Sequence, residues 1–406
     1  MKNQIKLIIP SSFLLVLVRI HLTLNNWKVL MRHWFNGRNS DIVTKCQYRI
    51  IREKSKHCFF GYYDVTPFNH DSSLVLNLTT DGKSNNATIN VYELKNDKNV
   101  PITKTSVWNW QQGCRLRWFP GRNDYIMFND IVDGKYCCRI VDAAKGQTVK
   151  TIKEPLYDID LTGRFGLTLN FAKLGIKRPG YGYTVLPFND INPAEDGVDI
   201  VDIENDRTRR LFTFQQIVKH LENPHGRYKD YYLNHLSFSP SGKKFLFFLL
   251  DSSTKRHEAY MFVYDIGKSS IIPLEVHDKV SHYVWKDDNE IIATVYDDNM
   301  NCGYYVYNVP EKRKTKYNSI SLDGHPSVYN SNALITDTYA DNMFQHLYIV
   351  ESNGESRELV RIFDDPYING ERRTDLHPRL DNSQKLVCVD ANISGYRQMI
   401  VFNINE

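Results

Sequence analysis

The feature that most constrains the fold is a motif that recurs through the C-terminal half of the chain. Its clearest copy is HLSFSPSGKKFLFFLLD, which begins at His235 and ends at Asp251. Ser-Pro-Ser-Gly favours a tight turn, and the apolar segments on either side are typical of a buried β-hairpin. The copies that begin with histidine start at His235, His282, His325 and His377. The motif therefore predicts a series of similar sheets.

Three further segments fit the pattern more loosely, one of them with arginine in the histidine position. They begin at Val65, Arg115 and Leu156. The seven starts lie 50, 41, 79, 47, 43 and 52 residues apart, which matches propeller blades of about 40–50 residues each. The sequence thus predicts an all-β fold, a seven-bladed β-propeller over residues 41–406, with an insertion around 170–230. Two packed sandwiches are the alternative, and the recurrence of one residue type at one offset favours the propeller.

Closure of the ring is expected to involve the two ends of this region. Either CQYRIIREK, near Cys46, or the terminal RQMIVFNIN completes the last blade. Closure removes exposed sheet edges, which are otherwise sites of aggregation.

Composition agrees with a globular β-protein. Hydrophobic residues make up 42% of the chain and charged residues 24%, which excludes disordered and fibrous classes. The 25 Tyr and 20 Phe favour strands over helices. The seven cysteines are odd in number and lack C-x-x-C spacing, so a reducing compartment is expected.

Residues 1–40 differ from the rest of the chain. They carry six basic residues and no acid, so the remaining residues have a net charge of −2 out of a total of +4, which argues against nucleic acid as a partner. The apolar stretch from Leu7 to Ile20 is shorter than the ~20 residues that span a bilayer. Trp27, Met31 and Trp34 share one face of a predicted basic helix.

This segment is typical of a helix that lies on an anionic membrane surface. The expected location is the cytoplasmic face of the inner membrane, as a peripheral protein, or the cytoplasm. Packing of the helix against the propeller and export through a signal anchor are the alternatives, and no small-residue cleavage site follows the apolar stretch.

The repeat predicts where the four histidines meet. In a propeller the first strand of each blade lines the central channel, so equivalent positions converge at one channel mouth. Each histidine could tie its blade to a neighbouring loop by a hydrogen bond. Together they could form a metal site or an acid–base cluster, since neutral imidazoles bind metals and titrate near neutral pH. Aspartates at the ends of the second strands, such as Asp337 and Asp390, are interpreted as turn caps.

Three loops carry further candidate residues. GYYD contains Tyr62, Tyr63 and Asp64, and WNWQQG combines indoles with amides, which sugar rings stack on and hydrogen-bond to. In RPGYGY, two glycines allow a backbone to approach a ligand closely. The structural alternatives are a blade-entry turn, a crossing between blades, and surface pairing of the arginines at 372, 373 and 379 with nearby aspartates. The chain has no nucleophile elbow, Walker loop or H-E-x-x-H motif.

As a set, these motifs resemble a bacterial propeller family that tends to accompany surface-polysaccharide genes. The resemblance rests on GYYDVTPFN, WNWQQGCRLRW, RPGYGY, the DGHPS and TDTY segments and RRTDLHPR, and it covers nearly all of residues 57–402. The His-Pro blades are also similar to oligogalacturonate lyases and TolB-like propellers. In those lyases, histidines and a glutamine hold a divalent metal. The resemblance implies His325 and His377 as metal ligands here, whereas Thr374 and Arg379 stand where Gln and a further His are expected.

The chemistry of a uronate lyase can be assembled from these residues. Removal of the proton next to a carboxylate requires neutralisation of that carboxylate by Arg or a metal, and a base and an acid within hydrogen-bond reach. The similarity to ulvan-type lyases, which use His and Tyr with Arg on the uronate, is architectural. The predicted catalytic residues are His235, His325, His377, Tyr63, Tyr183 and Arg115. The predicted substrate-binding residues are Tyr62, Asp64, Trp110, Gln112, Arg178, Tyr181, His282, Arg373 and Arg379.

The sequence therefore predicts a polysaccharide-active propeller that cleaves an acidic polysaccharide or oligosaccharide at the channel mouth, with a divalent metal as its expected cofactor. A non-catalytic glycan-binding or assembly factor in surface-polysaccharide biosynthesis is the alternative.

Overall fold

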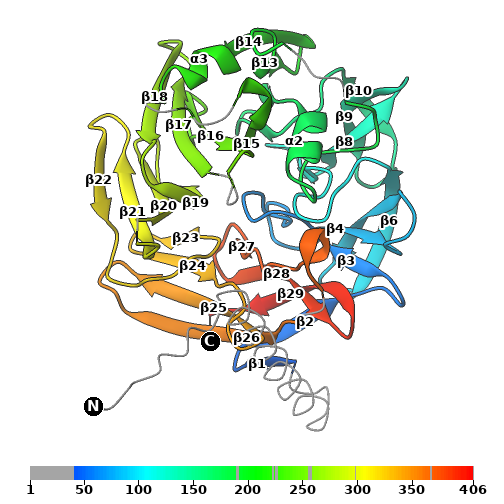
Figure 1. The fold of residues 1–406 in the computed structure, drawn as a ribbon. Coiled ribbons are helices and arrows are strands. Elements are labelled where there is room, and N and C mark those ends of the chain that lie inside the picture. The colour runs from blue at the N-terminus through cyan, green and yellow to red at the C-terminus, as the bar shows by residue number, and fades with distance from the viewer. Residues whose placement is uncertain are drawn as a thin grey trace, which may run out of the picture.

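The computed structural model describes residues 41–188, 192–221, 224, 227–254, 258–297, 299–365 and 368–405. The predicted membrane-associating segment, residues 1–40, lies outside these residues. Seven antiparallel sheets form a ring around a central channel (Figure 1). The predicted all-β, seven-bladed propeller is confirmed. Of the described helices, none has the length and apolar character needed to cross a membrane.

The first four blades follow each other along the chain, each with its innermost strand first. Blade 1 contains β3 (His57–Phe59), β4 (Leu74–Thr80), β5 (Ala87–Glu93) and β6 (Lys98–Thr105). Blade 2 contains β7 (Arg117–Trp118), β8 (Tyr125–Val132), β9 (Lys135–Asp142) and β10 (Thr148–Ile152). Blade 3 contains β11 (Asp158–Ile159), β12 (Phe165–Thr168), β13 (Gly197–Asp202) and β14 (Arg207–Thr213). Blade 4 contains β15 (Tyr231–Phe238), β16 (Lys244–Asp251), β17 (Glu258–Asp265) and β18 (Ser270–Glu275).

Blade 5 has the same sequential arrangement as the first four, whereas the last two blades take strands from both ends of the described chain. Blade 5 contains β19 (Lys279–Trp285), β20 (Glu290–Tyr296), β21 (Cys302–Asn308) and β22 (Arg313–Lys316). Blade 6 has β23 (Ser327–Asn330), β24 (Ala333–Asp337), β25 (Phe344–Glu351), β26 (Ser356–Phe363) and, at its outer edge, β1 (Ile42–Thr44). Blade 7 has β27 (Arg379–Leu380), β28 (Leu386–Ile393), β29 (Tyr396–Asn403) and β2 (Tyr48–Ile51).

Both segments considered for closure of the ring lie in blade 7. β2 pairs with β29, from Tyr48 opposite Phe402 to Ile51 opposite Met399. One N-terminal strand thus completes a sheet whose other strands are C-terminal, which hides the outer edge of β29. The fifth strand of blade 6, β1, has no counterpart in the predicted repeat.

The hairpin turn of the repeat owes its shape to one residue at positive φ. In Ser-Pro-Ser-Gly, the N–H of Gly242 donates to the carbonyl of Ser239 at 2.8 Å, and Gly242 has a φ of +69°. The same hydrogen bond closes the turns Asn69 to Ser72, Asp160 to Gly163 and Asp381 to Gln384. In these copies Ser72, Gly163 and Gln384 have φ values of 60°, 74° and 57°. The turn geometry is therefore shared where the residue type is not.

The core lies between neighbouring blades and is rich in aromatic rings. Phe212 of β14 packs on Phe247 of β16 with ring centroids 4.7 Å apart, and both side chains are almost fully buried. Burial of each such side chain contributes roughly 2–3 kcal/mol to stability. The second strand KFLFFLLD is apolar between Lys244 and Asp251, and every residue after Lys244 is buried, as in a strand covered on both faces.

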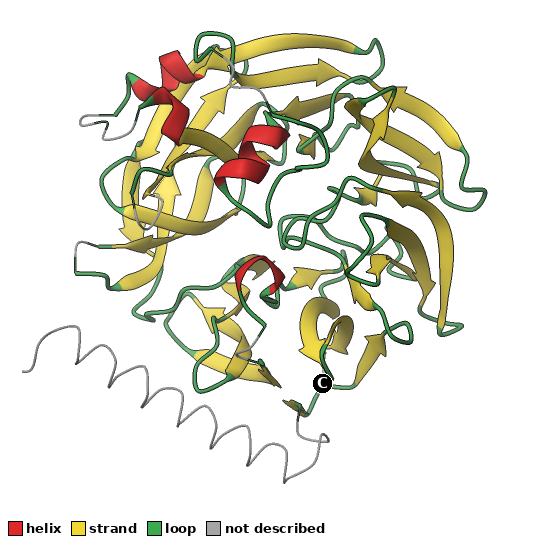
Figure 2. Cartoon of the chain, turned by 45° about the vertical axis from the view of Figure 1, so that its right-hand side comes forward, coloured by secondary structure: helices red, strands yellow, loops and turns green. Residues whose placement is uncertain are grey.

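The predicted insertion around 170–230 is divided into two segments. The strands β13 and β14, which separate the two segments, belong to the sheet of blade 3. The first follows β12 and contains α2 (Phe171–Lys177), whose N-cap Asn170 accepts a hydrogen bond from the backbone of Lys173. The second follows β14 and contains α3 (Phe214–Val218) and a 3₁₀ turn, Tyr228–Asp230. Another 3₁₀ turn, Gly370–Arg372, precedes β27. Figure 2 shows the helices as short segments in a chain otherwise built of strands.

Candidate functional site

The four histidines of the repeat converge in the channel. The ring centroids of His282 and His325 are 4.0 Å apart, and those of His325 and His377 are 4.3 Å apart. Tyr62 links the fourth member to this row, since its ring stacks on His235 at 5.2 Å and contacts His377 at 4.8 Å. All four imidazoles are buried. We refer to His235, His282, His325 and His377 as the histidine cluster.

A special backbone conformation brings three of the repeat anchors into the channel. Arg115, His235 and His377 have φ values of 54°, 58° and 49°. Non-glycine residues rarely adopt this left-handed conformation, which turns a side chain out of the regular strand alternation. At His235 the register of β15 against β16 shifts between Asn234 and Ser237, as in a β-bulge. His235 and His377 therefore reach the cluster through a backbone conformation that no sequence period reveals, whereas His282 and His325 are not at positive φ.

The Nδ1 atoms of three of these histidines are held by oxygen atoms. The Nδ1 of His282 lies 2.9 Å from a carboxylate oxygen of Asp323, and that of His325 lies 2.9 Å from Asp337. The Nδ1 of His377 lies 3.0 Å from the carbonyl oxygen of Gly61. A carbonyl can only accept, so Nδ1 of His377 carries the proton and its Nε2 has a free lone pair. The carboxylates favour the same tautomer at the other two histidines.

His235 has the opposite arrangement. The side-chain amide of Asn234 donates to its Nε2 at 3.2 Å, so the proton lies on Nδ1. That Nδ1 is buried and has no hydrogen-bond partner among the described residues. His235 is therefore a donor, whereas Nε2 of His377, also buried and unpartnered, is an acceptor.

The environment separates the pKa values of the cluster. Burial lowers the pKa of His282 below 6.5, and the neighbouring His325 adds to this effect. Burial also holds the pKa values of His235 and His377 well below 6.5, with cationic neighbours adding to it. Burial acts against the charged form of His325 too, but the carboxylate of Asp337 outweighs it and raises the pKa of His325. The cluster thus contains neutral imidazoles beside one that favours positive charge.

The GYYD loop fills the middle of the channel. Tyr63 contacts His325 with ring centroids 5.1 Å apart, and its hydroxyl donates to the backbone carbonyl of Tyr283 at 2.8 Å while accepting from the N–H of Tyr283 at 2.9 Å. Tyr63, a predicted catalytic residue, thus has both functions of its hydroxyl committed to a strand. Tyr62 is 3% exposed and lies among three histidine rings.

The GYYD and QQG loops interlock through two glycines. A Cβ on Gly61, which has a φ of +142°, would lie 2.9 Å from the carbonyl carbon of Gln112. A Cβ on Gly113 would lie 2.6 Å from the carbonyl oxygen of Phe60. The side chain of Gln112 donates to the hydroxyl of Tyr157 at 2.7 Å and to Asn234 at 3.1 Å. Gln112, predicted to bind substrate, therefore links three blades.

Arg115 and Asp64 form a buried ion pair below this layer. The guanidinium binds both carboxylate oxygens, at 3.1 and 2.9 Å, and its Nε donates to the carbonyl of Tyr157 at 2.8 Å. The two side chains are 4% and 6% exposed. Arg115, predicted to be catalytic, thus holds the GYYD loop in place.

Three other residues that the sequence assigned to the site make contacts within the propeller itself. The hydroxyl of Tyr183 accepts from the Asn129 side chain at 2.9 Å, and its ring stacks on Phe171 of α2 at 4.7 Å. Trp110 stacks on Phe59 at 5.5 Å. Arg379 is fully buried and pairs with Asp390 at 2.9 Å. Its Nη1 also donates to the carbonyl of Gly61 at 2.9 Å.

The RPGYGY segment and the loop before β27 meet above the cluster. Arg373 donates to the hydroxyl of Tyr181 at 3.1 Å, pairs with Asp375 at 3.1 Å and keeps 35% of its side chain exposed. The guanidinium of Arg178 lies 4.7 Å from the ring centroid of Tyr181. These cations are suited to an anionic ligand. The absence of a side chain at Gly182 lets its backbone approach α2 and not a ligand. A Cβ at this position would lie 2.4 Å from the carbonyl oxygen of Phe171.

One side of the cluster is close to solvent. Tyr339 is 43% exposed, and its ring centroid lies 6.1 Å from those of both His282 and His325. We call the surface that this side chain and Arg373 mark, above the buried imidazoles, the histidine mouth. Tyr339 ends the TDTY segment, but the sequence alone assigned it no role in the site.

Among the described residues, one group of side chains has the geometry of a metal site. The ligand atoms of His325, Asp375 and His377 all lie within 4.8 Å of one another, and all three residues are buried. Two features fit a divalent cation. The Nε2 of His377 has no hydrogen-bond partner among the described residues and lies 3.9 Å from a carboxylate oxygen of Asp375. The Nδ1 atoms of both histidines are held by oxygens, as in most metal-binding histidines. The oxygen of Thr374 accepts from Arg397 at 3.2 Å, and Arg379 is paired, so Asp375 is the third candidate ligand.

Sequence reasoning missed the roles of two aspartates. Asp337, predicted to be a turn cap, has its carboxylate facing Nδ1 of His325 and accepts the backbone N–H groups of His325 and His377 at 2.6 and 2.9 Å. Asp375 is one of the aspartates expected to pair with the nearby arginines, and it does pair with Arg373, but it is 5% exposed and adjoins the cluster. The TDLHP spacing around His377 could have indicated Asp375, whereas the role of Asp337 required the fold.

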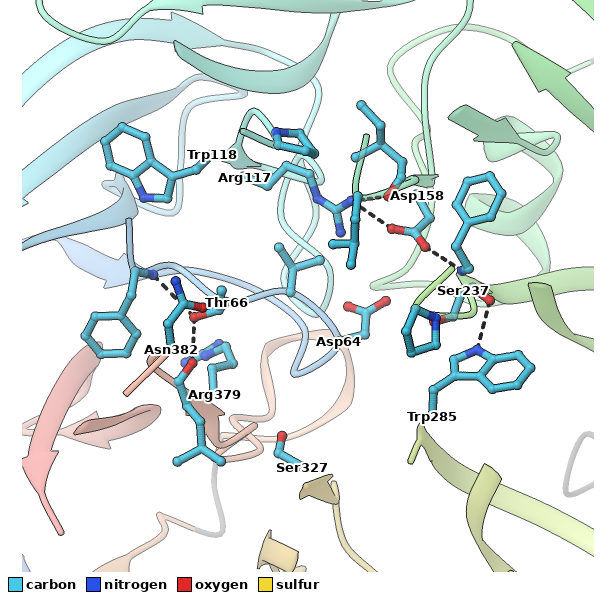
Figure 3. A pocket seen from close by; sticks show the side chains of 18 of the residues that line it. Asp64, Thr66, Arg117, Trp118, Asp158, Ser237, Trp285, Ser327, Arg379 and Asn382 are labelled. Atoms are coloured by element: carbon cyan, nitrogen blue, oxygen red, sulfur yellow. Dashed lines mark hydrogen bonds and ion pairs between the residues drawn. The ribbon is translucent and has the colours of Figure 1, made fainter. Parts of the chain in front are cut away.

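A large pocket lies at the opposite mouth of the channel (Figure 3). Its volume is about 940 Å³, and it is lined by the ends of the first strands and by the turns that follow them. Tyr63, Asp64, Tyr283 and Arg379 border it from the channel. Asp64, predicted to bind substrate beside the histidines, therefore faces the other opening.

The comparisons with known proteins match the fold. No family model matches the sequence, and no curated protein does. An oligogalacturonate lyase solved in complex with manganese has a TM-score of 0.65 and 13% identity over 90% of this chain and 98% of its own. An oligogalacturonate lyase from Vibrio parahaemolyticus has a TM-score of 0.63 and 12% identity over 90% of this chain and 98% of its own. The tricorn protease has a TM-score of 0.52 and 11% identity over 88% of this chain and 34% of its own.

The structural similarity to oligogalacturonate lyases that the sequence implied is thus confirmed, and this chain shares their propeller fold over nearly their whole length.

Proposed function

We propose that this chain is a polysaccharide-active propeller that cleaves an acidic glycan by lyase-like elimination at the histidine mouth. The observation that carries the proposal is the convergence of His282, His325 and His377 with Asp375 below the cationic side chain of Arg373. The similarity to oligogalacturonate lyases over 90% of the chain supports it. A role in surface-polysaccharide metabolism remains part of the proposal.

A divalent metal is the expected cofactor, and His325, His377 and Asp375 are the residues that would hold it. When bound, such an ion supplies positive charge to the carboxylate of a uronate. Asp337 and the carbonyl of Gly61 orient the two imidazoles by their contacts with Nδ1.

Residues of the chain bind the substrate, accept the proton and donate a proton to the leaving group. Arg373 binds a carboxylate of the substrate, because it is cationic, partly exposed and fixed by Tyr181. His282 accepts the proton, because its pKa is lowered and Asp323 orients it with Nε2 free. Tyr62 is a proton donor, because burial raises its pKa well above 10 and keeps its hydroxyl protonated. In this elimination the C5–H bond and the C4–O bond break, a C4=C5 double bond forms, and the leaving oxygen takes up a proton.

The test is the ultraviolet absorbance of the unsaturated product from a panel of uronate polymers, including polygalacturonate and alginate. We expect His282→Ala to lower kcat by about 10²–10⁴-fold with little change in KM, as for loss of a general base. His346→Ala is the matched control, because His346 lies on β25 and pairs with Glu358. Equal kcat in the His282 variant and the wild type would overturn the assignment.

Metal content provides a second test. Purified wild-type protein should contain a divalent ion that the His325→Ala, His377→Ala double variant lacks. Equal metal in both proteins would refute the metal site.

The second candidate function is non-catalytic binding of the same class of glycan. It is favoured by the burial of Tyr62, which is 3% exposed and lies over three imidazole rings. Glycan binding without an unsaturated product from any uronate polymer would select this function.

A further inference from the structure

The pocket at the mouth opposite the histidines is built from residues of many blades. Trp118 at the end of β7 and Trp285 at the end of β19 belong to blades 2 and 5 and lie on opposite sides of it, with Asp64 between them (Figure 3). Its volume of about 940 Å³ is at the upper end of the range of about 300–1,000 Å³ for ligand sites. The pocket therefore has room for several sugar-sized units.

The indole rings of this pocket are held in place by their own N–H groups. Nε1 of Trp118 donates to the carbonyl of Pro67 at 2.9 Å, and Nε1 of Trp285 donates to the carbonyl of Ser237 at 3.1 Å. Trp118 and Phe119 stay partly exposed, and Leu161 at the rim is 73% exposed. Fixed, partly exposed aromatic rings offer flat apolar surface for stacking at a low cost in entropy.

The charged groups of the pocket already have their countercharges. Arg117 pairs with Asp158 at 2.7 Å, Asp64 pairs with Arg115, and Arg379 pairs with Asp390. A charged ligand would have to compete with these ion pairs. Because the charges within each pair cancel, the pairs exert no net attraction on such a ligand. The pocket is thus suited to a neutral ligand, unlike the histidine mouth with Arg373.

Two polar side chains of the pocket are open to solvent. Asn123 and Asn382 both line it and are exposed. The side-chain amide of Asn382 donates to the carbonyl of His70 at 3.2 Å, and the side-chain oxygen of Asn123 accepts from the N–H of His70 at 3.4 Å. A side-chain amide has two N–H groups and an acceptor oxygen, so both side chains keep capacity to bond the hydroxyl groups of a ligand.

We propose that this pocket is a second binding site, for a neutral oligosaccharide. Its aromatic walls take the apolar faces of the sugar rings, and the side-chain amides of Asn123 and Asn382 bond to sugar hydroxyls. The inference goes beyond the proposed function, because the ligand is uncharged and the site lies at the other end of the channel.

The two sites are physically separate. Tyr63 lies between them, with its ring against His325 and its hydroxyl bound to the backbone of Tyr283. Occupation of the pocket therefore does not require the histidine cluster.

The test is calorimetric titration of the full chain with cellotetraose, maltotetraose, laminaritetraose and mannotetraose, and with tetragalacturonate as the charged comparison. We expect at least one neutral tetrasaccharide to bind with a Kd of ~1 mM or tighter. Trp118→Leu and Phe119→Ala should each weaken that binding at least ~10-fold, or about 1.4 kcal/mol. Trp108→Leu is the matched control, because Trp108 is another partly exposed indole, bound to the carbonyl of Asn85 and outside the pocket.

His377→Ala separates this inference from the proposed function. It should abolish cleavage at the histidine mouth and leave binding of the neutral sugar unchanged. Binding of none of the four neutral sugars would overturn the second site, as would equal affinity in the wild type and in folded Trp118→Leu and Phe119→Ala proteins. Displacement of the neutral sugar by tetragalacturonate would also overturn it, because a single site would then serve both ligands.

Discussion

The carboxylate of Asp337 at the end of β24 lies 2.9 Å from Nδ1 of His325 and accepts the backbone N–H of His377 at 2.9 Å. One buried side chain in blade 6 thus orients an imidazole of its own blade and fixes the backbone of the anchor of blade 7. Asp323 makes the same kind of carboxylate contact with Nδ1 of His282 and orients that imidazole. Carboxylates placed behind the histidines distinguish this channel from a simple packed core.

Asp337→Asn should weaken both stability and metal binding. An amide has one acceptor oxygen where the carboxylate serves two backbone N–H groups and an imidazole, so the free energy of unfolding should fall by about 2–3 kcal/mol. Loss of the group that orients a ligand should lower the metal affinity about 10–100-fold. Calorimetry and metal titration check both. Asp130→Asn, in the equivalent strand position of blade 2, is the control and should leave metal affinity unchanged; an unaltered affinity in the Asp337 variant would contradict the role.

Gly113→Ala should destabilise the protein more than Gly121→Ala. Both glycines have positive φ, of 59° and 72°, so both substitutions carry the conformational cost of about 1–2 kcal/mol. At Gly113 the new Cβ would meet a backbone atom, the carbonyl oxygen of Phe60 at 2.6 Å, whereas at Gly121 no atom of the described residues lies within 4 Å of it. We expect the difference in unfolding free energy between the variants to exceed ~1 kcal/mol. Equal denaturation midpoints would show that the interlocked loops do not constrain each other.

Asp64→Asn should cost about 3–5 kcal/mol of stability, because it leaves the buried guanidinium of Arg115 without its countercharge. The double variant Asp64→Leu, Arg115→Met should recover a large part of this loss, since no charge then remains buried. Asp124→Asn, which breaks the exposed pair with Arg122, is the control and should leave the denaturation curve unchanged. Denaturant unfolding measures all three; a single Asp64 variant as stable as the double variant would count against the buried pair.

His57 should make the protein less stable in mild acid. Burial and the neighbouring Arg397 lower the pKa of His57 from 6.5 to about 4. Between these values the unfolded chain binds a proton that the folded protein does not, so the unfolding free energy decreases as the pH falls from 6.5 to about 4. Because the ring is partly exposed, we expect this contribution to be about 1–2 kcal/mol.

The measurement for His57 is denaturant unfolding at several pH values in wild type and His57→Gln. The variant should lose less stability than the wild type on acidification below pH 6.5 and show no such difference above it. His70→Gln, at an exposed position, controls for loss of an imidazole. Parallel pH profiles for wild type and the His57 variant would rule out the depressed pKa.

The number of sheets and the positions of the anchors could be predicted because the information is local. A turn flanked by two apolar segments specifies a hairpin wherever it occurs, and its spacing along the chain gives the number of blades. The pattern did not reveal β1, a short edge strand without a turn signal, nor the division of the insertion, because β13 and β14 lie far from their turn motif.

The candidate site was predictable only in part. The repeat placed His282, His325 and His377 together, and the structure brings them within contact distance. The GYYD and RPGYGY segments suggested a catalytic role for Tyr63 and Tyr183, whose hydroxyls the structure shows bound to Tyr283 and Asn129. Residue type alone does not indicate whether a hydroxyl is free, because its partners come from other blades.

The amino-acid sequence by itself determined a ring of seven sheets with histidines at equivalent points, since hydrophobic period, turn residues and spacing act over short distances along the chain. Only the tertiary structure decided which nitrogen of each histidine is free, which carboxylates stand behind them, and that a second pocket faces the other way. The physical reason is ring closure: His377 contacts Gly61, 316 positions earlier, and no local pattern in the chain encodes such a contact.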